Sequence, residues 1–446
     1  MIFALAATLP VQLAAQQKPS RYRIVEIGTL GGPTNYPSVN RPGYQIISNS
    51  GIVAFSADTS TPDPLCFFNP DCFVSHATLW RDGVLTDLGA LPGADNSSGS
   101  GAINARGWVA GQSENGEIDP ASGLPEVRAV LWTKNEIIDL GTFGGNWSLA
   151  TTLNNLGQVV GFASNAIPDA FTVAIFPPST TQIRAFLWQK GVLQDLGTLG
   201  GPDAAALYIN QHGMVAGISY TDSTPNETTG IPTLHGFIWH NGRMVDLGTL
   251  GGTFVGPFGP DGSEGSFVLN DRGQVIGIST LAGDQTYHPF LWDNGTMKDL
   301  GTLGGDNGTA LWLTDTGEVV GQADLPGRQH HHAFLWRNGV MTDLGTLGTN
   351  STAVMMNSRG QIVGRSRTPS GLHAFLWEKG GPMVDLNTLI PSGSNLILEE
   401  AENINERGEI LVWTQPPGCP DDHVCGRLVL LVPCDVSDAS ACENDH

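Results

Sequence analysis

The feature that most constrains this chain is a short unit that recurs along nearly its whole length. Each copy is centred on a tryptophan that ends an apolar run and precedes a tight turn: Trp80, Trp132, Trp188, Trp239, Trp292, Trp336 and Trp377. Successive tryptophans lie 41 to 56 residues apart. A chain of 446 residues would ordinarily suggest two or three domains, but an array of repeats can form one domain at this length.

Each unit predicts four short antiparallel strands. The turn after the tryptophan is often Asn-Gly or Asp-Gly, which favours a hairpin because type I′ turns need positive φ at both central residues. Upstream, a turn such as Asn210 to Gly213 lies between two apolar runs and predicts a second hairpin. Four strands in this length are typical of a propeller blade.

The two ends of the chain set the number of blades. Seven complete units run from Ile47 to Leu389, and an eighth, ending with a strand at 427–431, lacks its last strand. Residues 23–32 end in the Gly-Thr-Leu-Gly-Gly of that missing strand. We therefore predict an all-β, single-domain propeller over residues 20–433, with eight four-stranded blades closed by pairing of residues 22–29 with 427–432; seven blades are the alternative.

Length variation is confined to one class of position. Five insertions fall between the second and third strands of a unit (58–75, 114–127, 165–183, 220–234 and 280–287), and a sixth, 253–266, precedes the next blade. In a propeller both loop types leave the same face, opposite the tight turns. Insertions gathered on one face often mark a binding face; neutral drift in exposed loops is the alternative.

A His or Arg stands four residues before each tryptophan position, and an acid follows the turn. The two are diagonal neighbours on one face of the hairpin. Because one active site would not need eight copies, we interpret them as structural pairs that satisfy buried polar groups, with a ring-like ligand or metal site as the alternative. The predicted pairs are His76 with Asp87, Arg128 with Asp139, Arg184 with Asp195, His235 with Asp246, His288 with Asp299, His332 with Asp343, His373 with Asp385, and Arg427 with Glu26.

The six cysteines form three local pairs, which predict disulfides between Cys66 and Cys72, Cys419 and Cys425, and Cys434 and Cys442. Their even number and short spacing favour an oxidising compartment. A zinc site is the rival, but it lacks close CxxC spacing and has only His423 nearby. Residues 434–446 are predicted to form a C-terminal tail that carries one of these disulfides.

Residues 1–17 form an apolar leader with small residues at its end, as in a secretory signal. The basic n-region is missing, so either the true start lies upstream or the signal is weak; a frayed apolar terminus is the alternative. No segment is apolar over the length needed to span a bilayer.

Charge narrows the classes of partner. The chain carries 21 basic and 43 acidic residues, a net charge of −22, which argues against nucleic acid or an anionic membrane. The acidic surface is compatible with solubility outside the cell and with a divalent cation such as calcium. We predict no cofactor. The chain also has no nucleophile elbow, phosphate loop or HExxH motif that would indicate catalysis.

The unit His332-Ala-Phe-Leu-Trp336, followed by Asp-Leu-Gly-Thr-Leu-Gly, resembles the HAF repeat family of extracellular repeat proteins. The full Asp-Leu-Gly-Thr-Leu-Gly-Gly stands at 195–201, 246–252 and 299–305. The resemblance implies secretion and a β-repeat fold, and it brings no established activity or catalytic residues. Arg128, Arg184 and Asn387 depart from the motif.

We therefore expect a secreted or cell-surface binding or scaffold module, monomeric, whose ligand face is formed by the insertion loops. The ligand is unidentified, with a glycan or a protein as candidates. The alternative is a secreted polysaccharide hydrolase or lyase that uses acidic residues on that face, such as Glu114, Asp119 and Asp261. A structural adhesion module is a third interpretation.

Overall fold

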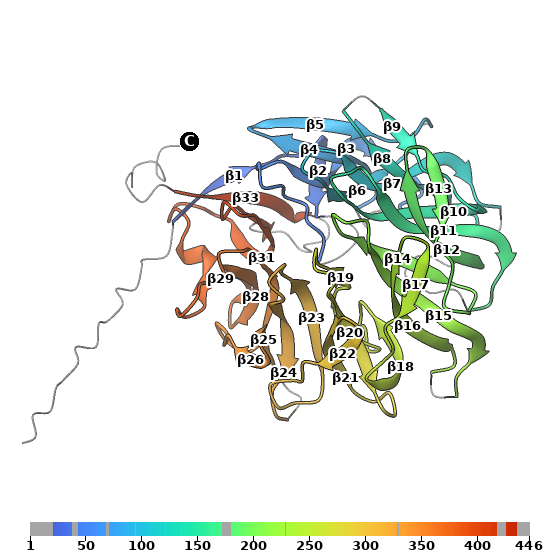
Figure 1. The fold of residues 1–446 in the computed structure, drawn as a ribbon. Helices are drawn as coiled ribbons and strands as arrows, with labels where there is room; N and C mark the ends of the chain where they lie inside the picture. The colour runs from blue at the N-terminus through green and yellow to red at the C-terminus, as the bar shows by residue number, and fades with distance from the viewer. Residues whose placement is uncertain are drawn as a thin grey trace, which may run out of the picture.

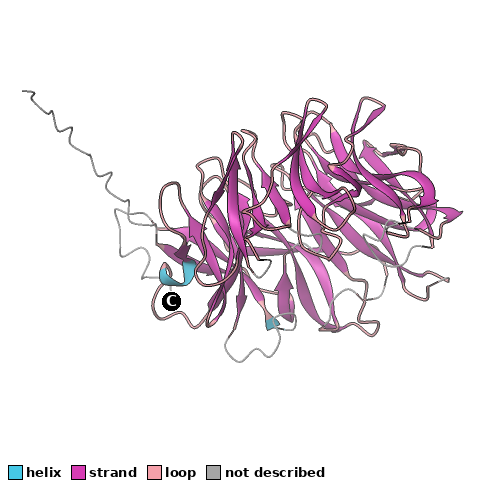
Figure 2. Ribbon diagram, turned by 90° about the horizontal axis from the view of Figure 1, so that it is seen from below, coloured by secondary structure: helices cyan, strands magenta, loops and turns pink. Residues whose placement is uncertain are grey.

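Strands radiate around an axis in the computed structural model (Figure 1), which describes residues 21–37, 43–67, 71–93, 95–120, 122–134, 136–171, 180–227, 229–327, 330–416 and 425–434. The predicted leader at 1–17 and most of the predicted tail lie outside these residues. The ring is built of strands, and loops connect them on its two faces (Figure 2). Within the described part of the chain, no helix is long and apolar enough to cross a membrane.

The first four blades follow one another along the chain, each beginning with its innermost strand. They comprise β2 (Gly31–Tyr36), β3 (Val53–Pro62), β4 (Phe73–Arg81) and β5 (Val84–Gly89); β6 (Ser98–Ile103), β7 (Val109–Ile118), β8 (Pro125–Trp132) and β9 (Ile137–Asp139); β10 (Gly144–Leu153), β11 (Val159–Pro168), β12 (Thr181–Gln189) and β13 (Val192–Asp195); and β14 (Ala204–Ile209), β15 (Val215–Pro225), β16 (Pro232–His240) and β17 (Arg243–Asp246).

Blades 5 to 7 continue this order, and blade 8 draws its outermost strand from the N-terminal end. They comprise β18 (Gly251–Gly256) with β19 (Val268–Leu269), β20 (Val275–Leu281), β21 (Tyr287–Asp293) and β22 (Thr296–Asp299); β23 (Gly308–Leu313), β24 (Val319–Asp324), β25 (His331–Arg337) and β26 (Val340–Asp343); β27 (Ser351–Met356), β28 (Ile362–Thr368), β29 (Gly371–Trp377) and β30 (Val384–Asp385), followed by the 3₁₀ turn η1 (Leu386–Thr388); and β31 (Ile397–Ile404), β32 (Ile410–Gln415), β33 (Arg427–Pro433) and β1 (Tyr22–Glu26).

The closure of the ring joins the two ends of the chain. β1 pairs antiparallel with β33, from Tyr22 opposite Pro433 to Glu26 opposite Val429. The predicted eight-bladed propeller and its closing strand are confirmed. Tyr22 is fully buried in the blade 7–8 core, so β1 contributes to the core as well as covering the edge of β33.

The repeated residues explain why each unit forms a blade. Asn294 and Gly295 in the hairpin turn of blade 5 have φ of 47° and 87°, as a type I′ turn requires. In blade 4, the phenylalanine position of the repeat lies opposite a glycine, Phe237 against Gly217. A Cβ at Gly217 would lie 2.6 Å from the Phe237 ring, and Phe237 is fully buried. The glycine therefore makes room for the ring, and close packing follows from the local sequence.

The inner strand is interrupted in two blades. In blade 5, residues 257–267 separate β18 from β19. In blade 1, β2 ends at Tyr36 and the strand resumes at Ile47, which bridges to Val53. The expectation that 253–266 connects two blades is therefore wrong, because this segment begins and ends inside blade 5.

The two interrupting segments lie at the axis. Ser266 donates its N–H to the Ala310 carbonyl of blade 6 at 2.9 Å. Asn403 of blade 8 donates to the Tyr44 carbonyl at 3.0 Å, and the Tyr44 ring stacks on Tyr208 of blade 4 at 6.5 Å. Residues 43–46 therefore contact blades on different sides of the ring and cross its centre.

Candidate functional site

The Asn-x-x-Gly turns form a hydrogen-bonded rim around the axis. In blade 3, the Asn154 Oδ1 accepts the N–H groups of Leu156 and Gln158, which closes the turn. Its Nδ2 donates to the carbonyl of Asn210 in the next blade at 3.1 Å. Equivalent links run from Asn104 to Asn154, Asn210 to Asn270, Asn270 to Thr314, Asn357 to Asn405, and, across the closure, Asn405 to Ser48.

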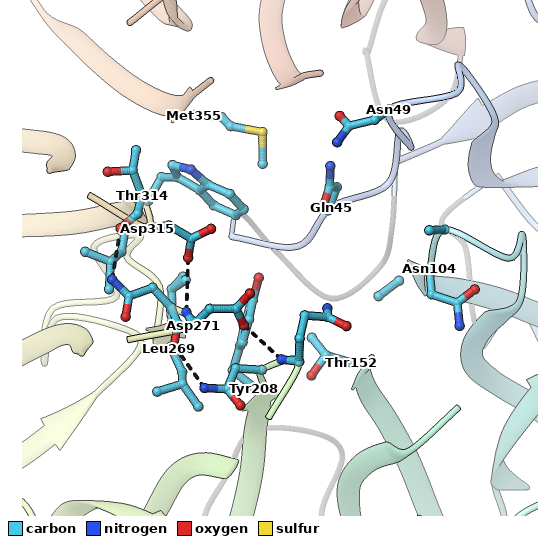
Figure 3. Close-up of a pocket in the computed structure, with 18 of the residues that line it drawn as sticks. Gln45, Asn49, Asn104, Thr152, Tyr208, Leu269, Asp271, Thr314, Asp315 and Met355 are labelled. Atoms are coloured by element: carbon cyan, nitrogen blue, oxygen red, sulfur yellow. Dashed lines mark hydrogen bonds between the residues drawn. The ribbon is translucent and has the colours of Figure 1, made fainter. Parts of the chain in front are cut away.

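The residue after each turn asparagine adds a second set of links. Gln211 N–H donates to Asp271 Oδ1 at 2.9 Å, and Asp271 N–H donates to Asp315 Oδ1 at 3.0 Å (Figure 3). Glu406 accepts the N–H of Ser358 in the same way at 3.1 Å. Three carboxylates are thereby held at the rim by backbone groups of neighbouring blades.

Inside this rim lies a cavity of about 670 Å³, lined by residues from all eight blades (Figure 3). Gln45, in the segment that crosses the axis, is part of the lining and accepts the Ile103 N–H through its carbonyl at 3.3 Å. The cavity therefore lies on the turn face, and the segment that crosses the axis lines it through Gln45.

One register position supplies much of the lining. It lies two residues before the turn asparagine or its equivalent, and it bears a different side chain in each blade: Ile46, Ala102, Thr152, Tyr208, Val268, Trp312, Met355 and Asn403. Six of these eight residues line the cavity, the exceptions being Ile46 and Asn403. Sequence reasoning missed them, although variation at a fixed position of a repeat was visible in the sequence.

The lining of the cavity is acidic and partly aromatic. It includes Asp271, Asp315, Glu406, Tyr208 and Trp312, and no Lys, Arg or His. Burial, together with the nearby Tyr44, Asp315 and Asp271, raises the pKa of the Tyr208 hydroxyl well above its ordinary value. Tyr208 therefore stays a neutral group that can both donate and accept a hydrogen bond.

The structure forms most of the predicted His/Arg–acid pairs away from the cavity, on the outer hairpins. His76, His235, His288, His332 and His373 contact their aspartates through Nδ1 at 2.7–3.0 Å. Arg184 Nε contacts Asp195 at 3.0 Å.

Two of the predicted pairs are wrong. Arg128 pairs with Glu126 at 2.9 Å instead of Asp139, because Glu126 lies two residues earlier on the same face of β8. Arg427 Nε donates to the Pro33 carbonyl at 3.2 Å instead of pairing with Glu26. Glu26 comes from the far end of the chain, so no hairpin turn sets its spacing to Arg427.

The aspartates of the formed pairs also organise the turn that follows them. Asp246 Oδ1 accepts the Gly248 N–H at 2.7 Å, and Gly248 has a φ of 72°. Burial alone would raise the pKa of Asp246, but the hydrogen bonds from His235 and Gly248 outweigh it and lower that pKa. The Asp-Leu-Gly motif thus stabilises a left-handed glycine by a local side-chain contact.

These pairs are less buried than the sequence suggested, since the Asp87, Asp246, Asp299 and Asp343 side chains are 40–45% exposed. We expect His332→Ala and His235→Ala each to lower the free energy of unfolding by about 0.5–1 kcal/mol, as for exposed ion pairs. The two losses should add, because the blades share no partner at these sites. Urea unfolding, with exposed His240→Ala as the control, measures this; variants as stable as the parent would contradict it.

The predicted Cys66–Cys72 disulfide is present, with a Cα–Cα distance of 4.4 Å. Cys425 and Cys434 are also disulfide-bonded. Their predicted partners, Cys419 and Cys442, lie outside the described residues, so these two pairings stay predictions. In the part of the chain that the structure describes, no group of three or more His, Cys, Asp or Glu residues is arranged to hold a metal ion.

The acids named for a hydrolase have structural partners on the insertion face. Glu114 accepts the Ser97 N–H at 2.8 Å, and its pKa is raised to about 7 by burial. Asp119 accepts from Asn146 at 2.9 Å, and Asp261 accepts from the Tyr287 hydroxyl at 3.0 Å. These contacts account for the three acids as supports of the insertion loops.

No protein-family model and no curated protein sequence matches this chain. Among solved structures, the β-propeller domain of the Trilobed protease from Pyrococcus furiosus is 9% identical, covering 80% of this chain and 96% of that one, with a TM-score of 0.41. Porphyromonas gingivalis dipeptidyl peptidase 4 is 10% identical, covering 89% and 65%, with a TM-score of 0.49. Pyrococcus horikoshii acylaminoacyl peptidase is 11% identical, covering 85% and 58%, with a TM-score of 0.40. This chain thus spans 65% and 58% of those two peptidase chains.

Proposed function

We propose that this protein is a ligand-binding β-propeller whose axial cavity takes a small polar ligand. A mono- or oligosaccharide is the class that fits the lining best. The observation that carries the proposal is the cavity of about 670 Å³. Much of its lining comes from the position two residues before each turn asparagine, which bears a different side chain in each blade although the residues around it repeat. Pockets for small ligands commonly have this size.

The lining suits a ligand rich in hydroxyl groups. Amide side chains such as Gln45, Asn155 and Gln211 and the rim carboxylates offer many hydrogen-bonding atoms, while Tyr208 and Trp312 present aromatic surface. The insertion loops, which the sequence predicted as the binding face because their lengths vary, lie on the face opposite the cavity. We place the ligand in the axial cavity because its lining comes from the inner strands and from turns that are hydrogen-bonded between blades.

We further propose that the protein acts outside the cytoplasm, as the HAF-type repeat implies. The Cys66–Cys72 disulfide and the bonded state of Cys425 and Cys434 support this location.

Titration calorimetry with cellobiose, maltotriose and diacetylchitobiose tests the binding proposal. We expect at least one of these sugars to bind, and Ala105→Trp to weaken its binding at least tenfold, because Ala105 is exposed on the cavity rim. The matched control is Leu156→Trp in the next blade, which is exposed but lies outside the lining. Binding by no sugar, or equal binding by both variants, would contradict the proposal.

A further inference from the structure

The insertion of blade 1 brings two carboxyl groups together on the face opposite the cavity. Asp58 lies on β3 and is fully buried, and Asp71 lies in the insertion beside the disulfide-bonded Cys72. The two side chains are within hydrogen-bonding reach of each other. Among the described residues, Asp58 Oδ1 has no hydrogen-bond donor.

Asp71 Oδ1 accepts the N–H of Phe73 on β4 at 3.3 Å, and the other two oxygens of this pair accept from β2. Asp58 Oδ2 accepts the Thr34 N–H at 2.9 Å. Asp71 Oδ2 accepts the Thr34 hydroxyl at 2.7 Å and the Tyr36 hydroxyl at 2.6 Å. Two carboxylates are both acceptors, so their close approach in a buried place requires a positive species between them.

Other blades show that the fold does not require this arrangement. At the position of Asp58, blade 5 has Thr280, whose hydroxyl accepts the Phe254 N–H at 3.2 Å and donates to Asp284 at 2.5 Å. In blade 5 a hydroxyl donor thus faces a carboxylate acceptor. Blade 3 has Ser164, whose hydroxyl accepts the Trp147 N–H at 2.9 Å. Blades 2 and 6 carry carboxylates at this position, Glu114 and Asp324, which accept the N–H groups of Ser97 and Asn307 at 2.8 and 3.2 Å. In blade 1 a second carboxyl group, Asp71, lies against this position.

We propose that Asp58 and Asp71, together with the Thr34 hydroxyl, bind a calcium ion. Calcium takes carboxylate, hydroxyl and water oxygens in flexible geometry. Because only two carboxylates contribute, the affinity belongs in the range of extracellular calcium modules, with a Kd of about 0.1–1 mM. The site is separate from the axial cavity and does not depend on the function proposed for it.

Calcium at this place would strengthen the closure of the ring. Tyr36 stacks on Trp413 of blade 8 with ring centroids 6.2 Å apart. Asn35, between the two β2 residues that hold the carboxyl pair, accepts the Leu428 N–H of blade 8 at 2.6 Å. An ion that orders β2 would therefore also stabilise the contact of blade 1 with blade 8, which joins the two ends of the chain.

The test is thermal unfolding of the full chain at pH 7.5 after EDTA treatment, titrated with CaCl₂ up to 10 mM against NaCl of equal ionic strength. The expected result is a rise in Tm that is half-complete at about 0.1–1 mM calcium. In Asp58→Asn the amide can donate to Asp71, as Thr280 donates to Asp284, so this variant should fold and lose the calcium response. Exposed Glu117→Gln in blade 2 is the matched control and should keep it.

A parent protein whose Tm ignores calcium would overturn the proposal, as would a calcium response that survives in Asp58→Asn. If the parent ignores calcium but gains stability on acidification, while Asp58→Asn does not, a shared proton is the positive species and the calcium site is refuted.

Discussion

We expect deletion of residues 1–30 to lower the free energy of unfolding by about 5 kcal/mol relative to deletion of residues 1–20. The longer deletion removes β1 with Tyr22, and Ile27 directly after it; the side chains of Tyr22 and Ile27 are 0% and 2% exposed. Burial of each such side chain contributes about 1.5–3 kcal/mol. The deletion also exposes the edge of β33, which should promote aggregation.

Guanidinium unfolding measures the stability of the two truncated proteins, and size-exclusion chromatography reports aggregation. Should the longer truncation prove too insoluble to study, Ile27→Ala provides the same test at smaller scale, with an expected loss of about 2–4 kcal/mol. Equal unfolding midpoints for the two truncations would contradict the role of β1 in closing the ring.

The second large effect concerns a cluster of charges that joins three blades. Arg365 on β28 of blade 7 bonds to Glu400 of blade 8 and to Glu264 in the axial segment of blade 5. Arg365→Met would leave these acids without their cation. We expect a loss of about 3 kcal/mol at pH 8, the lower end for a broken buried ion pair because the Arg365 side chain is 21% exposed.

The loss should depend on pH. Burial raises the pKa of Glu400 and Glu402 in the folded protein above their ordinary values, and Arg365 opposes this rise. Carboxyl groups with raised folded pKa values reduce stability as pH rises from their unfolded pKa through the folded one. Without Arg365 this reduction grows, so the difference between parent and variant should be larger at pH 8 than at pH 5.

Urea unfolding at both pH values measures the effect of Arg365→Met. Arg367→Met, two residues along the same strand and exposed, is the matched control and should change stability by less than about 0.5 kcal/mol. A loss that is the same at pH 5 and pH 8 would show that packing, and not charge, accounts for the role of Arg365.

The local sequence predicted the blades because their contacts span few residues. A hairpin such as β21–β22 depends on Asn294 and Gly295, and the contact from His288 to Asp299 spans only eleven residues. Because the unit is repeated, similar hairpins form in successive blades around the ring. The pairs failed where a competitor stood nearby, as Glu126 does for Arg128, or where the partner came from the other end of the chain, as Glu26 does for Arg427.

By itself the sequence determined the fold class, the number of blades, the closure of blade 8 by the N-terminal strand and the Cys66–Cys72 disulfide, since each follows from a repeated or short-range pattern. Only the tertiary structure decided where the axial cavity lies, which residues line it and which unlike groups meet at the axis. Tyr208, Trp312 and Asp315 become neighbours because inner strands from different blades converge there. Likewise, Glu264 meets Arg365 from a hundred residues away. Such contacts depend on the angle between blades, which the arrangement of the whole ring sets and no single repeat encodes.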